Sequence, residues 1–150
     1  MSKDVFTPER REAFHPVAWP RISEYAATLM LGSARDRSYT LDLAARRQLA
    51  EAELVWLHES LRDTADRLGR WRDELATLRR SLATLHRPRA GRGTPPETRM
   101  ELESGCRRIE RSLERWQRFE AQVQHLRRQL VCWLLASRDQ AHGSELRLAS

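Results

Sequence analysis

The sequence contains little glycine, proline or cysteine, no asparagine and almost no lysine. Of its 150 residues, 6 are glycine, 6 are proline and 2 are cysteine, whereas 32% are charged. Arg, Leu, Ala and Glu dominate instead, and all of them favour helices. Such a composition is typical of long helices and coiled coils rather than of a compact globule.

The two cysteines do not predict a disulfide. Cys106 and Cys132 fall on one predicted helix, 26 residues apart, which separates them by about 39 Å at 1.5 Å per residue. A disulfide requires Cα atoms within about 7 Å of each other. We therefore expect free thiols, which fit a reducing cytoplasm.

Targeting and membrane signals are also missing. The first four residues lead directly into a charged stretch, so we expect no signal peptide. The longest unbroken apolar run, residues 130–136, is far shorter than the roughly 20 residues that cross a bilayer. We therefore expect a cytoplasmic protein that does not bind membranes.

Catalytic motifs are absent as well. The chain has no HExxH pair, CxxC pair, GxSxG elbow or glycine-rich phosphate loop. The predicted helix register brings His58 near His125, and we weighed a metal site there against two surface histidines, which we favour. The sequence therefore predicts a protein that is not an enzyme, with no cofactor, no metal and no small-molecule substrate.

What is present is a pair of heptad seams, which predicts an all-α fold built on a long, coiled-coil-like antiparallel helical hairpin. The first helix is expected from about Ser38 to His86 and the second up to about Ser137. Thr64 fills one slot of the first seam and Arg47 interrupts another. The first seam comprises Leu43, Ala50, Leu54, Leu57, Leu61, Leu68, Trp71, Leu75, Leu78, Leu82 and Leu85. The second comprises Leu102, Cys106, Ile109, Leu113, Trp116, Phe119, Val123, Leu126, Leu130 and Trp133.

A turn at residues 87–94 joins the two seams, as its proline and glycine content indicates. Thr94 and Glu97 then form a capping box around Pro95, which suits the first position of a helix. The spacing predicts that Leu68 faces Trp116 across the pair. In the second seam, two successive spacings of three residues lead from Leu113 to Trp116 and on to Phe119. Such an irregularity, a stammer, overwinds the supercoil locally.

The hairpin is expected to rise from a small helical-bundle base formed by N-terminal short helices. One short helix is predicted near Thr7, ending at Pro16, and another at residues 20–31, ending at Gly32. The first long helix also carries a second apolar stripe that a two-stranded coil cannot cover. That stripe comprises Ala45, Leu49, Ala52 and Trp56. The predicted single domain 1–150 thus divides into a base, 16–57 with 122–140, and a projecting hairpin, 58–121.

Arginine supplies nearly all of the positive charge and marks the candidate binding residues. The net charge is +6 and the pI about 10.5, with 26 arginines and one lysine. Residues 75–96 hold five arginines and no acid, at the hairpin tip. A second group, spaced three, four and three, shares one face of the second helix. The tip residues are Arg79, Arg80, Arg87, Arg89 and Arg92, and the stripe residues are Arg108, Arg111, Arg115 and Arg118.

These arginines predict a non-enzymatic subunit of a nucleoprotein assembly that binds the phosphate backbone of DNA or RNA without reading bases. The alternative for Arg79 and Arg80 is helix capping and solubility, and for the stripe a solvated face with partial ion pairs. The alternative function is a coiled-coil scaffold or adaptor that binds a protein partner through the hairpin, and self-association is compatible with either. Trp71, Trp116 and Trp133 are expected in the core, with stacking platforms for bases as the other possibility.

Overall fold

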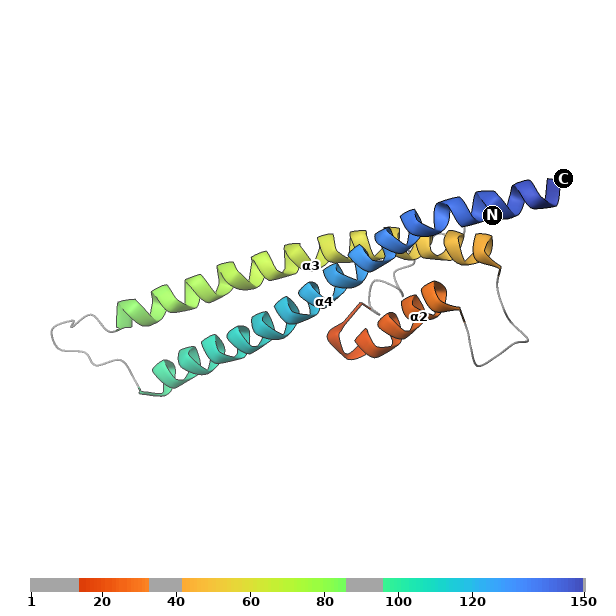
Figure 1. Ribbon diagram of the computed structural model, residues 1–150. Coiled ribbons are helices and arrows are strands. Elements are labelled where there is room, and N and C mark those ends of the chain that lie inside the picture. The colour runs from red at the N-terminus through yellow and green to blue at the C-terminus, as the bar shows by residue number, and fades with distance from the viewer. Residues whose placement is uncertain (1–13, 33–41, 86–95, 150) are drawn as a thin grey trace. The chain divides into compact units, whose positions relative to one another are not determined.

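The computed structural model describes residues 14–32, 42–85 and 96–149, with the side chains of 97–140 in the last range. All secondary structure within these ranges is helical (Figure 1). A short 3-10 helix, η1 (Pro16–Ala18), precedes α2 (Trp19–Leu31). Two long helices follow, α3 (Leu43–Leu85) and α4 (Pro96–Ala149). They form the predicted long antiparallel hairpin, so the all-α fold class is confirmed.

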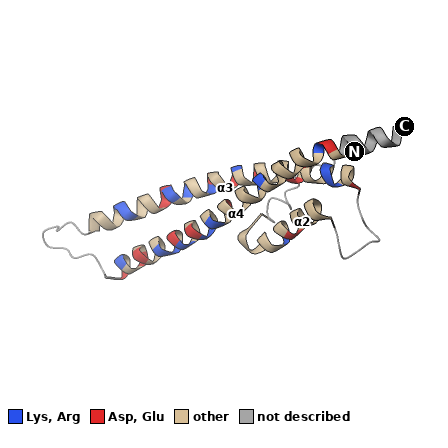
Figure 2. Ribbon diagram, in the orientation of Figure 1, with Lys and Arg blue, Asp and Glu red and all other residues tan. Residues whose placement is uncertain are grey.

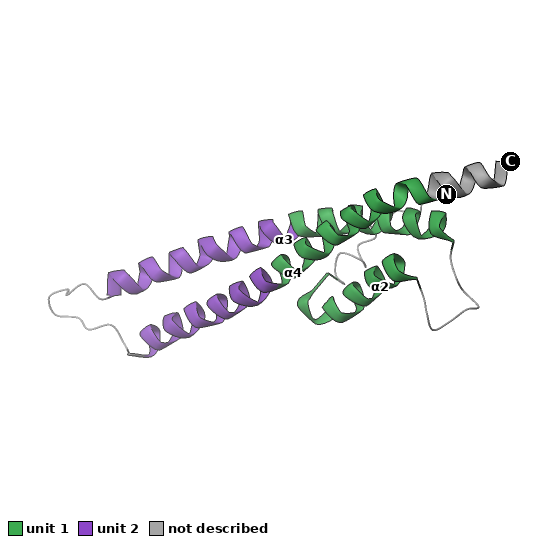
Figure 3. Cartoon of the chain, in the orientation of Figure 1, with its two compact units in different colours: residues 1–62, 119–150 green, residues 63–118 purple. Residues whose placement is uncertain are grey.

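The chain divides into two compact units, coloured separately in Figure 3. Unit 1 holds residues 1–62 and 119–150, and unit 2 holds residues 63–118. Both long helices contribute a segment to each unit. The prediction that the whole chain forms one domain stays a prediction.

Unit 2 is a pair of helical segments joined along the predicted seams. Its buried apolar side chains are Leu68, Leu75, Cys106, Leu113 and Trp116. Thr64, which fills a slot of the first seam, is also buried, and the remaining described seam positions of this unit are half-buried. Trp116 contacts Trp71, with ring centroids 5.9 Å apart, and also Arg67. Because Arg67 and Trp71 lie within one helical turn of Leu68, the observed register is within a turn of the predicted one.

Unit 1 adds α2 to the α3 and α4 segments and has the larger apolar core. Ile22, Ala26 and Leu29 of α2 are buried, whereas Tyr25 is 39% exposed. Four aromatic rings complete the core. Phe14 contacts Trp56 at 5.4 Å and Phe119 at 4.7 Å between centroids, and Trp19 contacts Phe119 at 5.9 Å.

The stammer in the second seam falls at the boundary between the two units. Trp116, before the unit boundary, contacts Trp71 of α3, whereas Phe119, after it, contacts Phe14 and Trp19. Two successive steps of three residues rotate the apolar face of α4 faster than heptads do.

The ends of α2 are defined by local hydrogen bonds. His15 Nδ1 accepts from the Val17 backbone N–H at 3.1 Å and caps η1, which begins at Pro16. Gly32 ends α2, as predicted, with φ 74°. The Arg46 guanidinium of α3 donates to the carbonyls of Leu29 and Met30 at 3.3 and 3.4 Å. Such donation satisfies carbonyls that have no partner within the helix.

Two predicted helix boundaries differ from the structure. We expected the first long helix from Ser38, but α3 begins at Leu43, because the Asp42 side chain accepts from the Ala45 N–H at 2.7 Å as an N-cap. We expected the second to end near Ser137, but α4 continues to Ala149. Residues 138–149 contain no proline and mostly good helix formers, and one glycine costs only about 1 kcal/mol.

Several predictions fall outside the described residues. These are the helix near Thr7, the turn at 87–94 and the capping role of Thr94 with Pro95. Both cysteines are free, as expected, and Cys106 is buried whereas Cys132 is exposed.

Candidate nucleic-acid interface

The arginine stripe lies on α4 within unit 2. Its four residues, Arg108, Arg111, Arg115 and Arg118, are all exposed. Their spacing of three, four and three keeps them on one side of the helix. The buried Cys106 and Leu113 lie on the other side, against α3. From the first to the last, the stripe spans about 15 Å along the helix axis.

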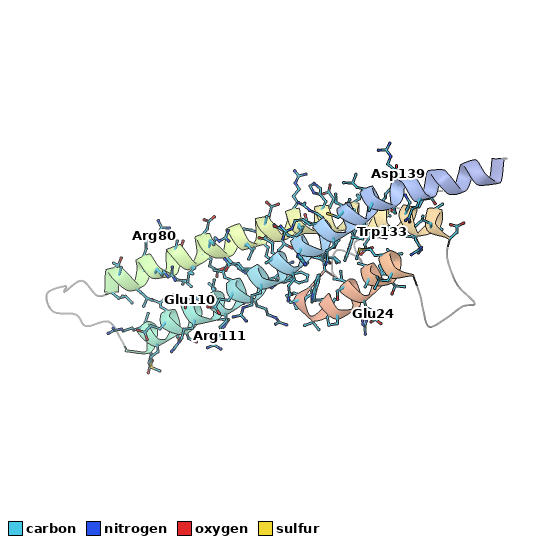
Figure 4. All side chains as sticks on the ribbon, viewed as in Figure 1. Glu24, Arg80, Glu110, Arg111, Trp133 and Asp139 are labelled. Carbon is cyan, nitrogen blue, oxygen red and sulfur yellow. The ribbon has the colours of Figure 1, made fainter. Side chains whose placement is uncertain are left out.

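The stripe retains its charge. Within the part of the chain that the structure describes, none of these four guanidinium groups forms an ion pair with a carboxylate. Glu114 is exposed and lies three or four residues from Arg111 and Arg118, but it pairs with neither. Figure 2 shows basic and acidic residues interspersed along this half of α4, and Figure 4 labels Arg111. The stripe is therefore available to an external anion.

The two described arginines of the predicted tip have other contacts. Arg79 Nη2 lies 3.0 Å from Glu110 Oε1 across the helix pair, with side chains 61% and 43% exposed. Arg80 Nη2 donates to Thr77 Oγ1 at 3.2 Å. The ion pair is solvent-exposed and contributes little stability, but it offsets the charge of Arg79. Figure 4 labels Arg80 and Glu110.

The other three tip residues, Arg87, Arg89 and Arg92, lie outside the described residues. The structure therefore brings together the four stripe residues on one helix face. It does not show the predicted tip as a group.

Sequence reasoning missed one arginine beside the seam. The Arg67 guanidinium carbon lies 4.6 Å from the ring centroid of Trp116, above the ring. Trp116 is only 6% exposed, whereas Trp71 is half-buried and Arg67 exposed. The spacing of Arg67 four residues before Trp71 was a weak signal, since it places both on one side of α3. The three-dimensional pairing of α3 with α4 was needed to see the contact.

His58, which we predicted to lie near His125, contacts an arginine in unit 1, and its proximity to His125 stays a prediction. His58 Nδ1 lies 3.4 Å from Arg127 Nη1, a contact in which the neutral imidazole nitrogen accepts. In the described ranges, no group of three or more His, Cys, Asp or Glu side chains is placed to hold a metal ion.

Unit 1 also exposes apolar side chains. Val131 and Leu135, one turn apart on α4, are 38% and 65% exposed, and Val55 of α3 is 53% exposed. Single exposed apolar residues are ordinary on protein surfaces. Among the helices searched, which are those of the described residues, none has an apolar stretch long enough to cross a bilayer.

Comparison with known proteins gave no match among protein-family models, curated proteins or solved structures.

Proposed function

We propose that this chain is a non-enzymatic basic subunit of a cytoplasmic nucleoprotein assembly, which binds the phosphate backbone of DNA or RNA without base-specific readout. Four exposed guanidinium groups on one face of α4, free of carboxylate partners among the described residues, support the proposal. Arginine presents a planar fork that matches phosphate geometry, and it keeps its charge at any physiological pH.

The length of the stripe suits this role. A span of about 15 Å along α4 meets a few successive phosphates of a nucleic-acid strand. Contacts to phosphate fix a protein on the strand but carry no sequence information. Other subunits of the assembly are expected partners, and self-association is compatible with this arrangement.

The test is a salt series with a charge-matched control. Purified protein is titrated with labelled DNA and RNA of unrelated sequence, and the logarithm of affinity should fall linearly with the logarithm of salt concentration. Changing Arg108, Arg111, Arg115 and Arg118 together to Glu should abolish binding to all sequences alike. The control changes four exposed arginines of unit 1 to Glu, namely Arg21, Arg62, Arg128 and Arg138.

The two variants have the same net charge, so they separate a specific face from overall charge. The control should bind more weakly than the wild type but far more strongly than the stripe variant. Circular dichroism checks that both variants remain helical. If the wild-type protein ignores nucleic acid at low salt, or if the two variants lose binding equally, the proposal is wrong.

A second candidate function is a scaffold that binds a protein partner. Val131 and Leu135, exposed one turn apart on α4, favour this candidate, because apolar side chains gain nothing from phosphate. Changing both residues to Ser or Thr should then remove the partner from a pull-down while leaving affinity for nucleic acid unchanged. If only the variant with Glu in place of the four stripe arginines loses the protein partner, these apolar residues are not its binding surface.

A further inference from the structure

The tryptophan pair of unit 2 has unequal exposure. Trp71 of α3 and Trp116 of α4 meet with ring centroids 5.9 Å apart and an interplanar angle of 66°. Trp116 is 6% exposed and serves the core, whereas Trp71 is only half-buried. A half-buried indole next to a fixed neighbour is held in place while part of its ring meets solvent. Such a ring can accept a stacked planar group.

Arg67 supplies a cation beside this pair. Its guanidinium carbon lies 4.6 Å from the Trp116 ring centroid, and the residue is exposed. No carboxylate pairs with Arg67 in the described part of the chain. A guanidinium stacked on a ring keeps its N–H groups in its own plane, where they remain free to donate to an anion. Arg67 is therefore oriented by Trp116 and still able to bind phosphate.

Two of the four stripe residues, Arg108 and Arg115, lie on the same edge of unit 2 as the tryptophan pair. The Arg79–Glu110 ion pair lies on one edge of the two helices. In a projection down the axis of α4, with 100° per residue, one direction of rotation from Glu110 meets Leu113, then Trp116, then Arg108 and Arg115. Arg108 and Arg115 therefore lie beyond Trp116, on the side away from Glu110. On α3, Arg67 and Trp71 lie across the seam from Arg79 by the same geometry.

We infer that this edge of unit 2 binds single-stranded nucleic acid, with a base stacked on Trp71 and neighbouring phosphates on Arg67, Arg108 and Arg115. This inference rests on the proposed function and deepens it by naming the form of nucleic acid. Arginines alone hold a duplex as well as a single strand. An aromatic ring beside the arginines adds stacking energy only when a base is unpaired, because the bases of a duplex are already stacked on each other.

The experiment compares a labelled oligo(dT) strand with a duplex of the same length at low salt. Wild-type protein should bind the single strand more tightly. Changing Trp71 to Leu, which keeps an apolar side chain at the seam, should weaken single-strand binding by at least about fivefold. Its affinity for the duplex should stay within about twofold of the wild type. Trp71→Phe, which keeps an aromatic ring, should restore most of the lost affinity.

A second variant and a second signal keep the inference testable if Trp71→Leu does not fold. Arg67→Lys preserves charge but loses the planar stack on Trp116, so it should weaken single-strand binding and leave duplex binding unchanged. Titration of wild-type protein with oligo(dT) should quench tryptophan fluorescence, and Trp71→Phe should lose most of that quenching.

Two negative results have different meanings. If the wild type binds both forms equally and Trp71→Leu changes neither, the inference is overturned while the proposed function stands. If the wild type binds neither form at low salt, the proposed function fails and this inference fails with it.

Discussion

The guanidinium of Arg47 on α3 donates a hydrogen bond to the backbone carbonyl of Leu134 on α4. A second hydrogen bond goes to the hydroxyl of Ser137, which is buried. Arg47 occupies the heptad slot that interrupts the first apolar seam, so a polar link fills the place of an apolar contact. A single polar residue at such a position can fix the register of paired helices.

We expect Arg47→Ala to lower the free energy of unfolding by about 1.5–3 kcal/mol, since hydrogen bonds from a charged group are lost inside unit 1. Urea unfolding followed by circular dichroism measures this value. Arg128→Ala, at an exposed position of α4, is the matched control and should change stability by less than about 0.5 kcal/mol. Equal effects of the two substitutions would show that the Arg47 contact contributes nothing.

Two glycines should respond to alanine with opposite signs. Gly69 lies within α3, and a Cβ added there meets no atom within 4 Å. We expect Gly69→Ala to raise the free energy of unfolding by about 0.5–1 kcal/mol, because alanine favours the helix. Gly32 adopts φ 74° and ψ 155°, a conformation almost restricted to glycine. Gly32→Ala should lower stability by about 1–3 kcal/mol. A shared sign in urea unfolding would contradict this assignment.

The rings of Phe14 and Phe119 should be energetically coupled. Both are buried, at 5% and 1% exposure, and their centroids lie 4.7 Å apart. We expect Phe119→Ala to cost about 3–5 kcal/mol, the usual effect of removing a buried phenylalanine. In a double-mutant cycle with Phe14→Ala, the two effects should fall short of additivity by about 0.5–1.5 kcal/mol. Strictly additive effects would mean that the N-terminal segment does not pack on α4.

The two thiols should differ in accessibility. Cys132 is exposed on α4 and should react quickly with a thiol reagent in the native protein. Cys106, 7% exposed on the seam of unit 2, should become reactive only as that unit opens. Mass spectrometry of peptides after timed labelling distinguishes them. Faster labelling of Cys106 than of Cys132 would require a different rotation of α4.

The features that sequence alone predicted are those set by local chemistry or by periodicity. Heptad spacing identified the buried Leu57, Leu68 and Val123, because one apolar side of a long helix must be covered. Gly32 was predicted as a helix end, because its freedom to adopt positive φ acts within a few residues.

The remaining features depend on which helices meet. Arg47 bonds to Leu134, and Arg79 pairs with Glu110, so each contact joins residues that are 31 or more positions apart. A search for partners three or four residues away on the same helix misses both contacts. Phe14 lies outside any periodic segment, so its place in the core followed from no pattern. For the binding residues, the sequence predicted the stripe from its spacing, but it did not find Arg67, whose stacking partner Trp116 lies on the other helix.

The tryptophans are divided between the units in a way that spectroscopy can use. Trp71 and Trp116 form a close pair in unit 2, whereas Trp19, Trp56 and Trp133 belong to unit 1. Two indoles at 5.9 Å couple their electronic transitions. The resulting exciton couplet reports on unit 2, so heating the intact chain can show whether that unit melts before the rest of the protein.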